Sequence, residues 1–150
     1  MTRQEDILCD FIENEDRIWP PGLAPIAFVN ALKEVLTRLP DDAYDAVCET
    51  VSFVVEDPKI TATNVPFNRT YPSLPDGITI QFNTIVIFHQ ALAYPGAALV
   101  GLLAHELAHS FVDEQNYNAD EDAADALVVR WGFAKEIAAL RAEQQKAKQE

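Results

Sequence analysis

The chain has 150 residues, of which 49% are hydrophobic, a content typical of a globular domain rather than a disordered chain. At this length we expect a single domain with a substantial core. The formal net charge of −13 argues against nucleic acid or an anionic membrane as a partner. Because the N-terminus is acidic and no run reaches the roughly 18 apolar residues that span a bilayer, we expect a cytoplasmic protein.

The first 56 residues predict mainly helices, because apolar side chains recur there at helical spacing. The first helix belongs to an N-terminal helical extension that we place at residues 1–22. Pro25 suits a first helical turn, and Pro40 closes the far end of the second helix. Thr50–Glu56 is rich in β-branched residues and predicts a strand. The three predicted helices are residues 4–19, 25–39 and 43–49.

Residues 57–77 form a long polar segment that contains several prolines. Ordered loops of that length often have a function, so this one either shapes a substrate cleft or is an irregular surface connection. Residues 78–88 are again apolar and β-branched, and they predict one strand or two paired strands that bend at Asn83. His89 follows directly, at the junction with the next helix.

Gly96–Val112 is an apolar, proline-free run that contains the pentapeptide HELAH. Histidines four residues apart share a helix face, with Cβ atoms about 5–6 Å apart, so His105 and His109 can both reach one ion. Each Zn–N bond is only about 2.0–2.1 Å long. Glu106, rotated by roughly 100° from His105, can then reach a metal-activated water without being a ligand.

A His-Glu-x-x-His string also arises by chance in helices rich in alanine and leucine. The apolar flanks of HELAH argue against a chance match, because they predict a mostly buried helix. Three ionisable side chains in such a helix are costly unless something such as a metal ion satisfies them. Gly101 lies one turn before His105. It lowers helix propensity, but it allows another backbone to approach closely near this site.

A catalytic zinc site usually has three protein ligands, so one ligand must lie outside HELAH. Asp113 would sit about 12 Å along a straight helix from His105, too far to share its ion. A new helix is predicted to begin near Asn118. On it, Glu121 shares a face with apolar residues and is favoured, whereas Asp122 on the neighbouring flank remains the alternative ligand. Acidic residues are in any case common at helix N-termini.

HELAH followed by Glu-x-x-Ala-Asp at residues 121–125 resembles the gluzincin group of zinc peptidases. This group includes the CAAX-prenyl and heat-shock membrane proteases and the soluble minigluzincins, and ImmA/IrrE-type peptidases are more loosely similar. The resemblance covers residues 84–133. The roles it implies are His105, His109 and Glu121 as ligands of one Zn²⁺ ion, Glu106 as general base, and Asp125 as the outer carboxylate that orients a ligand histidine.

The resemblance also implies a fold, which is an α+β, zincin-like domain. It would have a small twisted, mostly antiparallel sheet packed on helices that include the HExxH helix, with residues 84–88 as the edge strand beside the cleft. Residues 1–150 would form this one domain, ending in a polar and frayed tail at residues 141–150. A third downstream histidine is absent from the sequence, so the transition-state stabiliser would be Tyr117, Arg130 or His89.

The function expected from these residues is peptide-bond hydrolysis by a zinc-dependent peptidase. Glu106 would remove a proton from the metal-activated water, and an extended peptide or protein substrate would lie along residues 84–88. Two alternatives remain open. One is a non-catalytic module that binds a peptide or a partner, and the other is a metal-dependent hydrolase of a small amide. A membrane-protease role is not expected, because no transmembrane helix is predicted.

Overall fold

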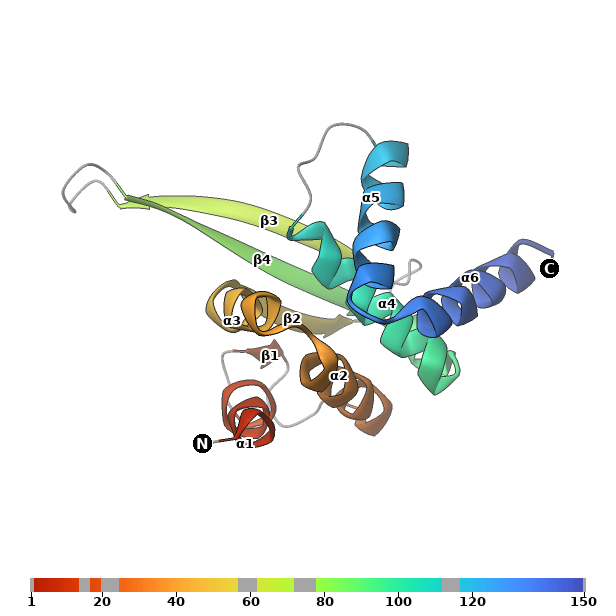
Figure 1. The fold of residues 1–150 in the computed structure, drawn as a ribbon, viewed down its shortest axis with the longest axis horizontal. Coiled ribbons are helices and arrows are strands. Elements are labelled where there is room, and N and C mark those ends of the chain that lie inside the picture. The colour runs from red at the N-terminus through yellow and green to blue at the C-terminus, as the bar shows by residue number, and fades with distance from the viewer. Residues whose placement is uncertain are drawn as a thin grey trace.

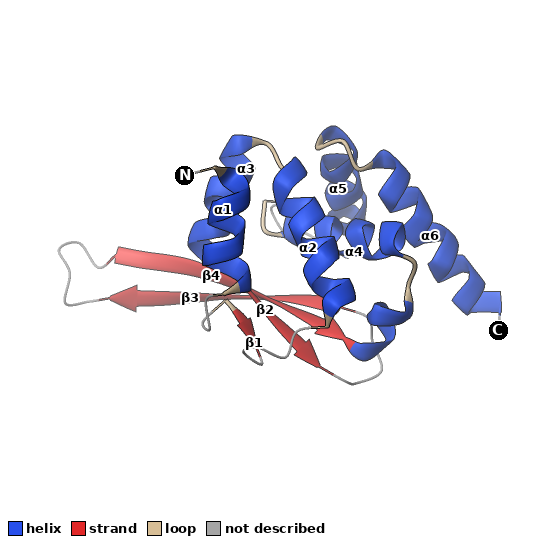
Figure 2. Ribbon diagram, turned by 90° about the horizontal axis from the view of Figure 1, so that it is seen from below, coloured by secondary structure: helices blue, strands red, loops and turns tan. Residues whose placement is uncertain are grey.

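The computed structural model contains several helices and one sheet. The α-helices lie on one side of the sheet, and the far ends of two strands extend beyond them (Figures 1 and 2). The residues that the structure describes are 2–13, 17–19, 25–56, 62–71, 78–111 and 117–149.

The helical elements are α1 (Arg3–Ile7), the π-helical turn η1 (Leu8–Ile12), α2 (Ile26–Arg38), α3 (Asp41–Thr50), the 3₁₀-helix η2 (His89–Ala93), α4 (Gly96–His109), α5 (Tyr117–Arg130) and α6 (Ala134–Gln149). The strands are β1 (Ile18–Trp19), β2 (Val51–Glu56), β3 (Ala62–Tyr71) and β4 (Ile78–Phe88). Among these described elements, no helix combines the length and the apolar character that crossing a membrane requires.

The expected zincin-like α+β fold with a mostly antiparallel sheet is wrong. The structure is mostly helical, and strand β2 pairs in parallel with both β1 and β4. The strand order is β1-β2-β4-β3, with β3 antiparallel to β4. The parallel pairing arises because the chain leaves β1, passes through helices α2 and α3, and returns to β2 in the same direction. Such a crossover connection produces parallel strands, whereas a hairpin produces antiparallel ones.

Two strand assignments also change. Residues 84–88 belong to the single long strand β4, which lies between β2 and β3, so they do not form an edge of the sheet. The edge beside β4 is β3, which occupies residues 62–71 of the segment expected to be a loop. The rest of that segment, residues 57–61 and 72–77, lies outside the described residues.

The N-terminal helix is shorter than predicted. Helix α1 begins with a capping box in which Thr2 Oγ1 accepts a hydrogen bond from the Glu5 amide at 3.2 Å, and Glu5 Oε2 accepts one from the Thr2 amide at 3.0 Å. Helical structure ends at Ile12, and Ile18–Trp19 forms β1 instead of a last helical turn. At the other end of the chain, α6 continues to Gln149, so the expected frayed tail is helical through that residue.

Helix α4 is the central element, and every residue from Ala98 to Ala108 is buried. It contacts α2, α5, α6 and the edge strand β3. The prediction that Gly101 allows another backbone to approach is confirmed. A Cβ atom built on Gly101 would lie 2.3 Å from the carbonyl oxygen of Glu136, in the first turns of α6. Only a glycine at this position lets α4 and α6 pack at their observed separation.

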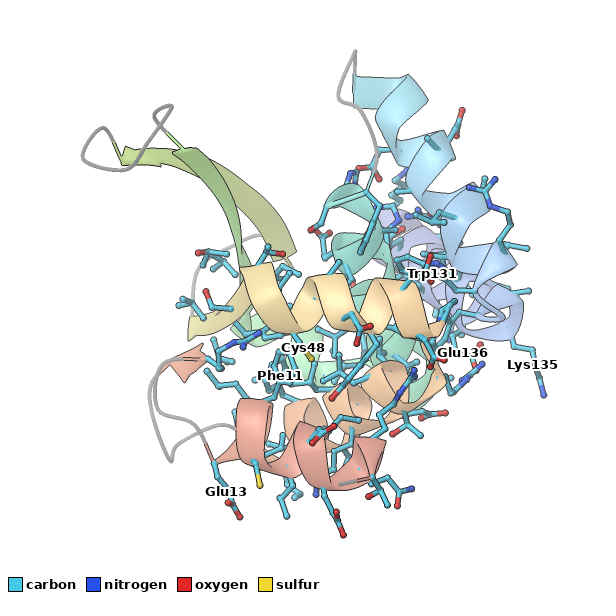
Figure 3. All side chains as sticks on the ribbon, turned by 60° about the vertical axis from the view of Figure 1, so that its left-hand side comes forward. Phe11, Glu13, Cys48, Trp131, Lys135 and Glu136 are labelled. Atoms are coloured by element: carbon cyan, nitrogen blue, oxygen red, sulfur yellow. The ribbon has the colours of Figure 1, made fainter. Side chains whose placement is uncertain are left out.

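The start of α6 is also held through the side chain of Glu136. Its Oε1 accepts a hydrogen bond from Arg38 Nη1 of α2 at 2.6 Å. Figure 3 shows Glu136 directed against the helices, whereas the adjacent Lys135 points away from the molecule. This ion pair and the Gly101 contact together fix the position of α6 relative to α2 and α4.

Candidate metal site

Helix α4 places two ionisable side chains in the interior of the protein. His105 is 3% exposed and Glu106 is 8% exposed, and both lie in the apolar helix that fills the core. Burying such groups carries a large desolvation cost unless a neighbouring group compensates it. The HELAH motif therefore lies on a buried helix and not on a surface helix.

Helix α5 brings Glu121 against both histidines. The Oε2 atom of Glu121 lies 3.0 Å from His105 Nε2, and its Oε1 atom lies 3.0 Å from His109 Nε2. The two Nε2 atoms are themselves 3.1 Å apart. His105, His109 and Glu121 thus form a group that could hold a metal ion.

The donor atoms of this group fit a cation. Asp125 Oδ1 lies 2.7 Å from His105 Nδ1, and because a carboxylate only accepts hydrogen bonds, Nδ1 carries the proton. In the neutral ring, Nε2 of His105 then presents a lone pair toward another acceptor, the carboxylate of Glu121. Burial lowers the pKa of His105 and so favours this neutral form. Ligand atoms of a tetrahedral zinc lie about 3.3 Å apart, close to the observed separations.

Glu106 stands beside this group on the same helix. Burial, together with the negative charge of Glu121, raises the pKa of Glu106 to about 7, although the positive charge of Arg141 opposes this shift. A carboxyl group with a pKa near neutrality can both take up and release a proton there, which is what a general base has to do.

The other predicted site residues are placed differently. Asp122 is exposed and lies outside the group of converging ligand atoms. Arg130 ends α5, nine residues after Glu121 and so roughly 14 Å further along the axis, and its side chain is exposed. Tyr117 begins α5 and His89 begins η2, but the side chains of both lie outside the described residues.

Asp125 contacts His105, and it makes a further contact that the sequence did not reveal. Arg141 of α6 donates hydrogen bonds to both of its carboxylate oxygens, from Nη2 to Oδ1 at 2.5 Å and from Nε to Oδ2 at 3.2 Å. The local pattern gave no signal for this contact, because residues 141–150 are polar and repetitive and were expected to fray.

No family model matches the chain, and neither a curated protein nor a solved structure matches it. The class that the geometry itself defines is a mostly helical protein with two histidines and one glutamate that could hold a metal ion. The assignment of a particular ion and a particular reaction therefore depends on the chemistry of these residues.

Proposed function

We propose that this protein is a zinc-dependent peptidase in which His105, His109 and Glu121 hold the metal. The observation that carries the proposal is the convergence of their ligand atoms to within 3.0–3.1 Å beside the buried carboxyl group of Glu106. Two imidazoles and one carboxylate form a donor set that is typical of catalytic zinc. The resemblance of HELAH and residues 121–125 to the gluzincin motifs supports the same assignment.

A bound zinc ion supplies a Lewis acid that polarises a carbonyl group and lowers the pKa of water. The protein's own residues supply the remaining chemistry. Glu106, whose carboxyl group is buried, takes the proton from the attacking water and passes it to the leaving amine. Asp125 holds the proton of His105 on Nδ1, so that Nε2 keeps its lone pair for the metal.

The edge strand β3 is the part of the sheet that best suits an extended substrate. Among the described strands, β3 is hydrogen-bonded on one side only, to β4, and it contacts the helix α4 that bears the histidines. An extended peptide can pair with the other side of such a strand through main-chain hydrogen bonds. This position replaces residues 84–88, which are central in the sheet.

The experiment compares the zinc-loaded wild-type protein with Glu106→Gln on a mixture of peptides and on a set of small amides. We expect the variant to bind zinc as the wild type does and to lose peptide hydrolysis by at least about 100-fold. Asp45→Asn, which changes an exposed carboxylate of α3, serves as the control and should retain activity. Full activity in Glu106→Gln contradicts the assigned base, and hydrolysis of small amides alone contradicts the assigned substrate class.

A further inference from the structure

The carboxylate of Asp125 is shared between the candidate metal site and helix α6. Its Oδ1 atom accepts hydrogen bonds from His105 Nδ1 at 2.7 Å and from Arg141 Nη2 at 2.5 Å, and its Oδ2 atom accepts one from Arg141 Nε at 3.2 Å. Arg141 thus forms a bidentate contact, in which Nε and Nη2 on one edge of its guanidinium group each donate to a different carboxylate oxygen. Such two-point contacts fix the plane of a carboxylate as well as its position.

Asp125 needs a support of this kind. Its side chain is 32% exposed, whereas that of His105 is 4% exposed, so Asp125 connects the buried ring to the surface. A half-exposed carboxylate without a second partner is free to turn toward water, and it then leaves the imidazole without an acceptor at Nδ1. Arg141 is itself held, because its Nη1 atom donates to Gln144 Oε1 at 2.6 Å.

Resting on the proposed function, we infer that Arg141 is a positioning residue for the metal ion. It acts through Asp125 to hold the His105 ring so that Nε2 faces His109 and Glu121. The last helix of the chain is in this way part of the candidate site, although it contributes no ligand. The close approach of α6 to α4 at Gly101 sets the position from which Arg141 reaches Asp125.

The direction in which zinc affinity changes when Arg141 is removed shows whether Arg141 acts by positioning Asp125 or only through its charge. A positive charge near a metal site repels a dication, so a guanidinium group that acted only through its charge would weaken zinc binding, and its removal would strengthen binding. If Arg141 instead orients His105, its removal weakens zinc binding. Loss of an outer hydrogen-bond partner of a zinc ligand typically lowers metal affinity about 10–100-fold.

The test measures zinc affinity at fixed pH, by competition with a chelator of known affinity, for the wild type, Arg141→Gln, Arg141→Lys and Lys148→Gln. We expect Arg141→Gln to bind zinc about tenfold more weakly or worse. Arg141→Lys should also be weakened, because a lysine keeps the charge but not the two-point contact. Lys148→Gln removes one exposed positive charge from the same helix and should bind as the wild type does.

A double-mutant cycle with Asp125→Ala shows whether Arg141 acts through that residue. In the Asp125→Ala background, Arg141→Gln should cause no further loss of affinity. In the zinc-loaded protein, NMR should show that the Nδ1 proton of His105 exchanges with solvent faster in Arg141→Gln than in the wild type. A general loss of stability would instead speed up the exchange of many protons throughout the protein.

Unchanged or tighter zinc binding in Arg141→Gln overturns the inference and leaves the proposed function intact. A further loss of affinity in the Asp125→Ala background also overturns it, since Arg141 would then act by another route. If the wild-type protein binds no zinc, the proposed function itself fails, and that result is seen before any variant is compared.

Discussion

The imidazole rings of His105 and His109 direct their Nε2 atoms toward each other, 3.1 Å apart, from successive turns of the same buried helix. A neutral imidazole has one N–H donor and one acceptor, and the donor of His105 is already engaged with Asp125. The second nitrogen of His105 therefore faces His109 and Glu121 as an acceptor. A cation between these atoms would bind both the lone pair of His105 Nε2 and the carboxylate of Glu121.

Replacing each of the two neighbouring acidic residues near the start of α5 by alanine should show which of them is a metal ligand. We expect Glu121→Ala to weaken zinc binding by at least about 100-fold, because it removes a ligand atom, whereas Asp122→Ala should leave binding unchanged. The measurement is a zinc titration of each purified variant. Equal losses in both variants would contradict the assignment of Glu121 as the third ligand.

The buried carboxyl group of Glu106 makes the metal-free protein less stable at high pH. Its pKa is raised to about 7 from 4.5, so its contribution to folding is fully present below about pH 4.5 and is lost as the pH rises through 7. In chelator-treated protein, Glu106→Gln should therefore become more stable than the wild type above pH 7, by up to about 3 kcal/mol.

Urea unfolding of both proteins at several pH values between 4.5 and 8 measures this difference. The two free energies of unfolding should approach each other as the pH falls toward 4.5, where the wild-type carboxyl is neutral in the folded chain and half protonated in the unfolded chain. A difference that does not depend on pH would show that Glu106 is not held in a desolvated environment.

The close approach of α4 and α6 predicts that a methyl group at residue 101 is not tolerated. A Cβ atom there would lie 2.3 Å from Glu136 O and 2.7 Å from Glu136 C, and backbone atoms cannot move aside as a flexible side chain can. Gly101→Ala should lower the free energy of unfolding by about 1–3 kcal/mol, although alanine is the better helix former.

Gly96→Ala is the matched control, because a Cβ atom at Gly96 meets nothing within 4 Å. It should be neutral or stabilising by a few tenths of a kcal/mol. Thermal unfolding of both variants tests the contrast, and a Gly101→Ala protein as stable as the wild type would mean that α4 and α6 pack less closely than described.

The ion pair between Arg38 and Glu136 should stabilise the fold at neutral pH and lose its effect in acid. The hydrogen bond from Arg38 lowers the pKa of Glu136, so the contribution of this pair is present above the ordinary glutamate pKa and is lost as the pH falls through the lowered value. Glu136→Gln should cost about 1–2 kcal/mol at pH 7 and much less at pH 3.

Glu34→Gln provides the comparison for that pair. Glu34 contacts the same guanidinium group at 3.2 Å, but its side chain is 53% exposed, whereas that of Glu136 is 13% exposed. Exposed pairs four residues apart on a helix contribute only about 0.3–0.5 kcal/mol. Chemical denaturation at pH 7 should therefore rank Glu136→Gln well below Glu34→Gln in stability.

The helices that carry the candidate site could be predicted because their signals are local. The apolar, proline-free run around HELAH predicts α4, and the ligand spacing predicts which face bears His105 and His109. Glu121 could be preferred to Asp122 because its helical face is shared with apolar residues. The close approach of another backbone at Gly101 could also be predicted, because the sequence alone shows a glycine one turn before His105.

The sheet could not be predicted in the same way. Strand β1 has two residues, too few for an alternating pattern, and its neighbours suggested a helix. Strand β3 contains Pro66, which made its segment resemble a loop, yet proline is tolerated on an edge strand because no hydrogen bond from its nitrogen is needed there. The contact of Arg141 with Asp125 depends on the packing of α6, which no local pattern specifies.

The metal content and coordination of the native protein, measured by elemental analysis and X-ray absorption at the zinc edge, decide whether the proposed zinc site exists. We expect one zinc ion per chain, bound by two imidazole nitrogens at about 2.0–2.1 Å and by a carboxylate oxygen at about 2.0–2.2 Å. A folded protein that contains no metal and takes up none, or a zinc ion bound without the imidazoles of His105 and His109, would contradict this expectation.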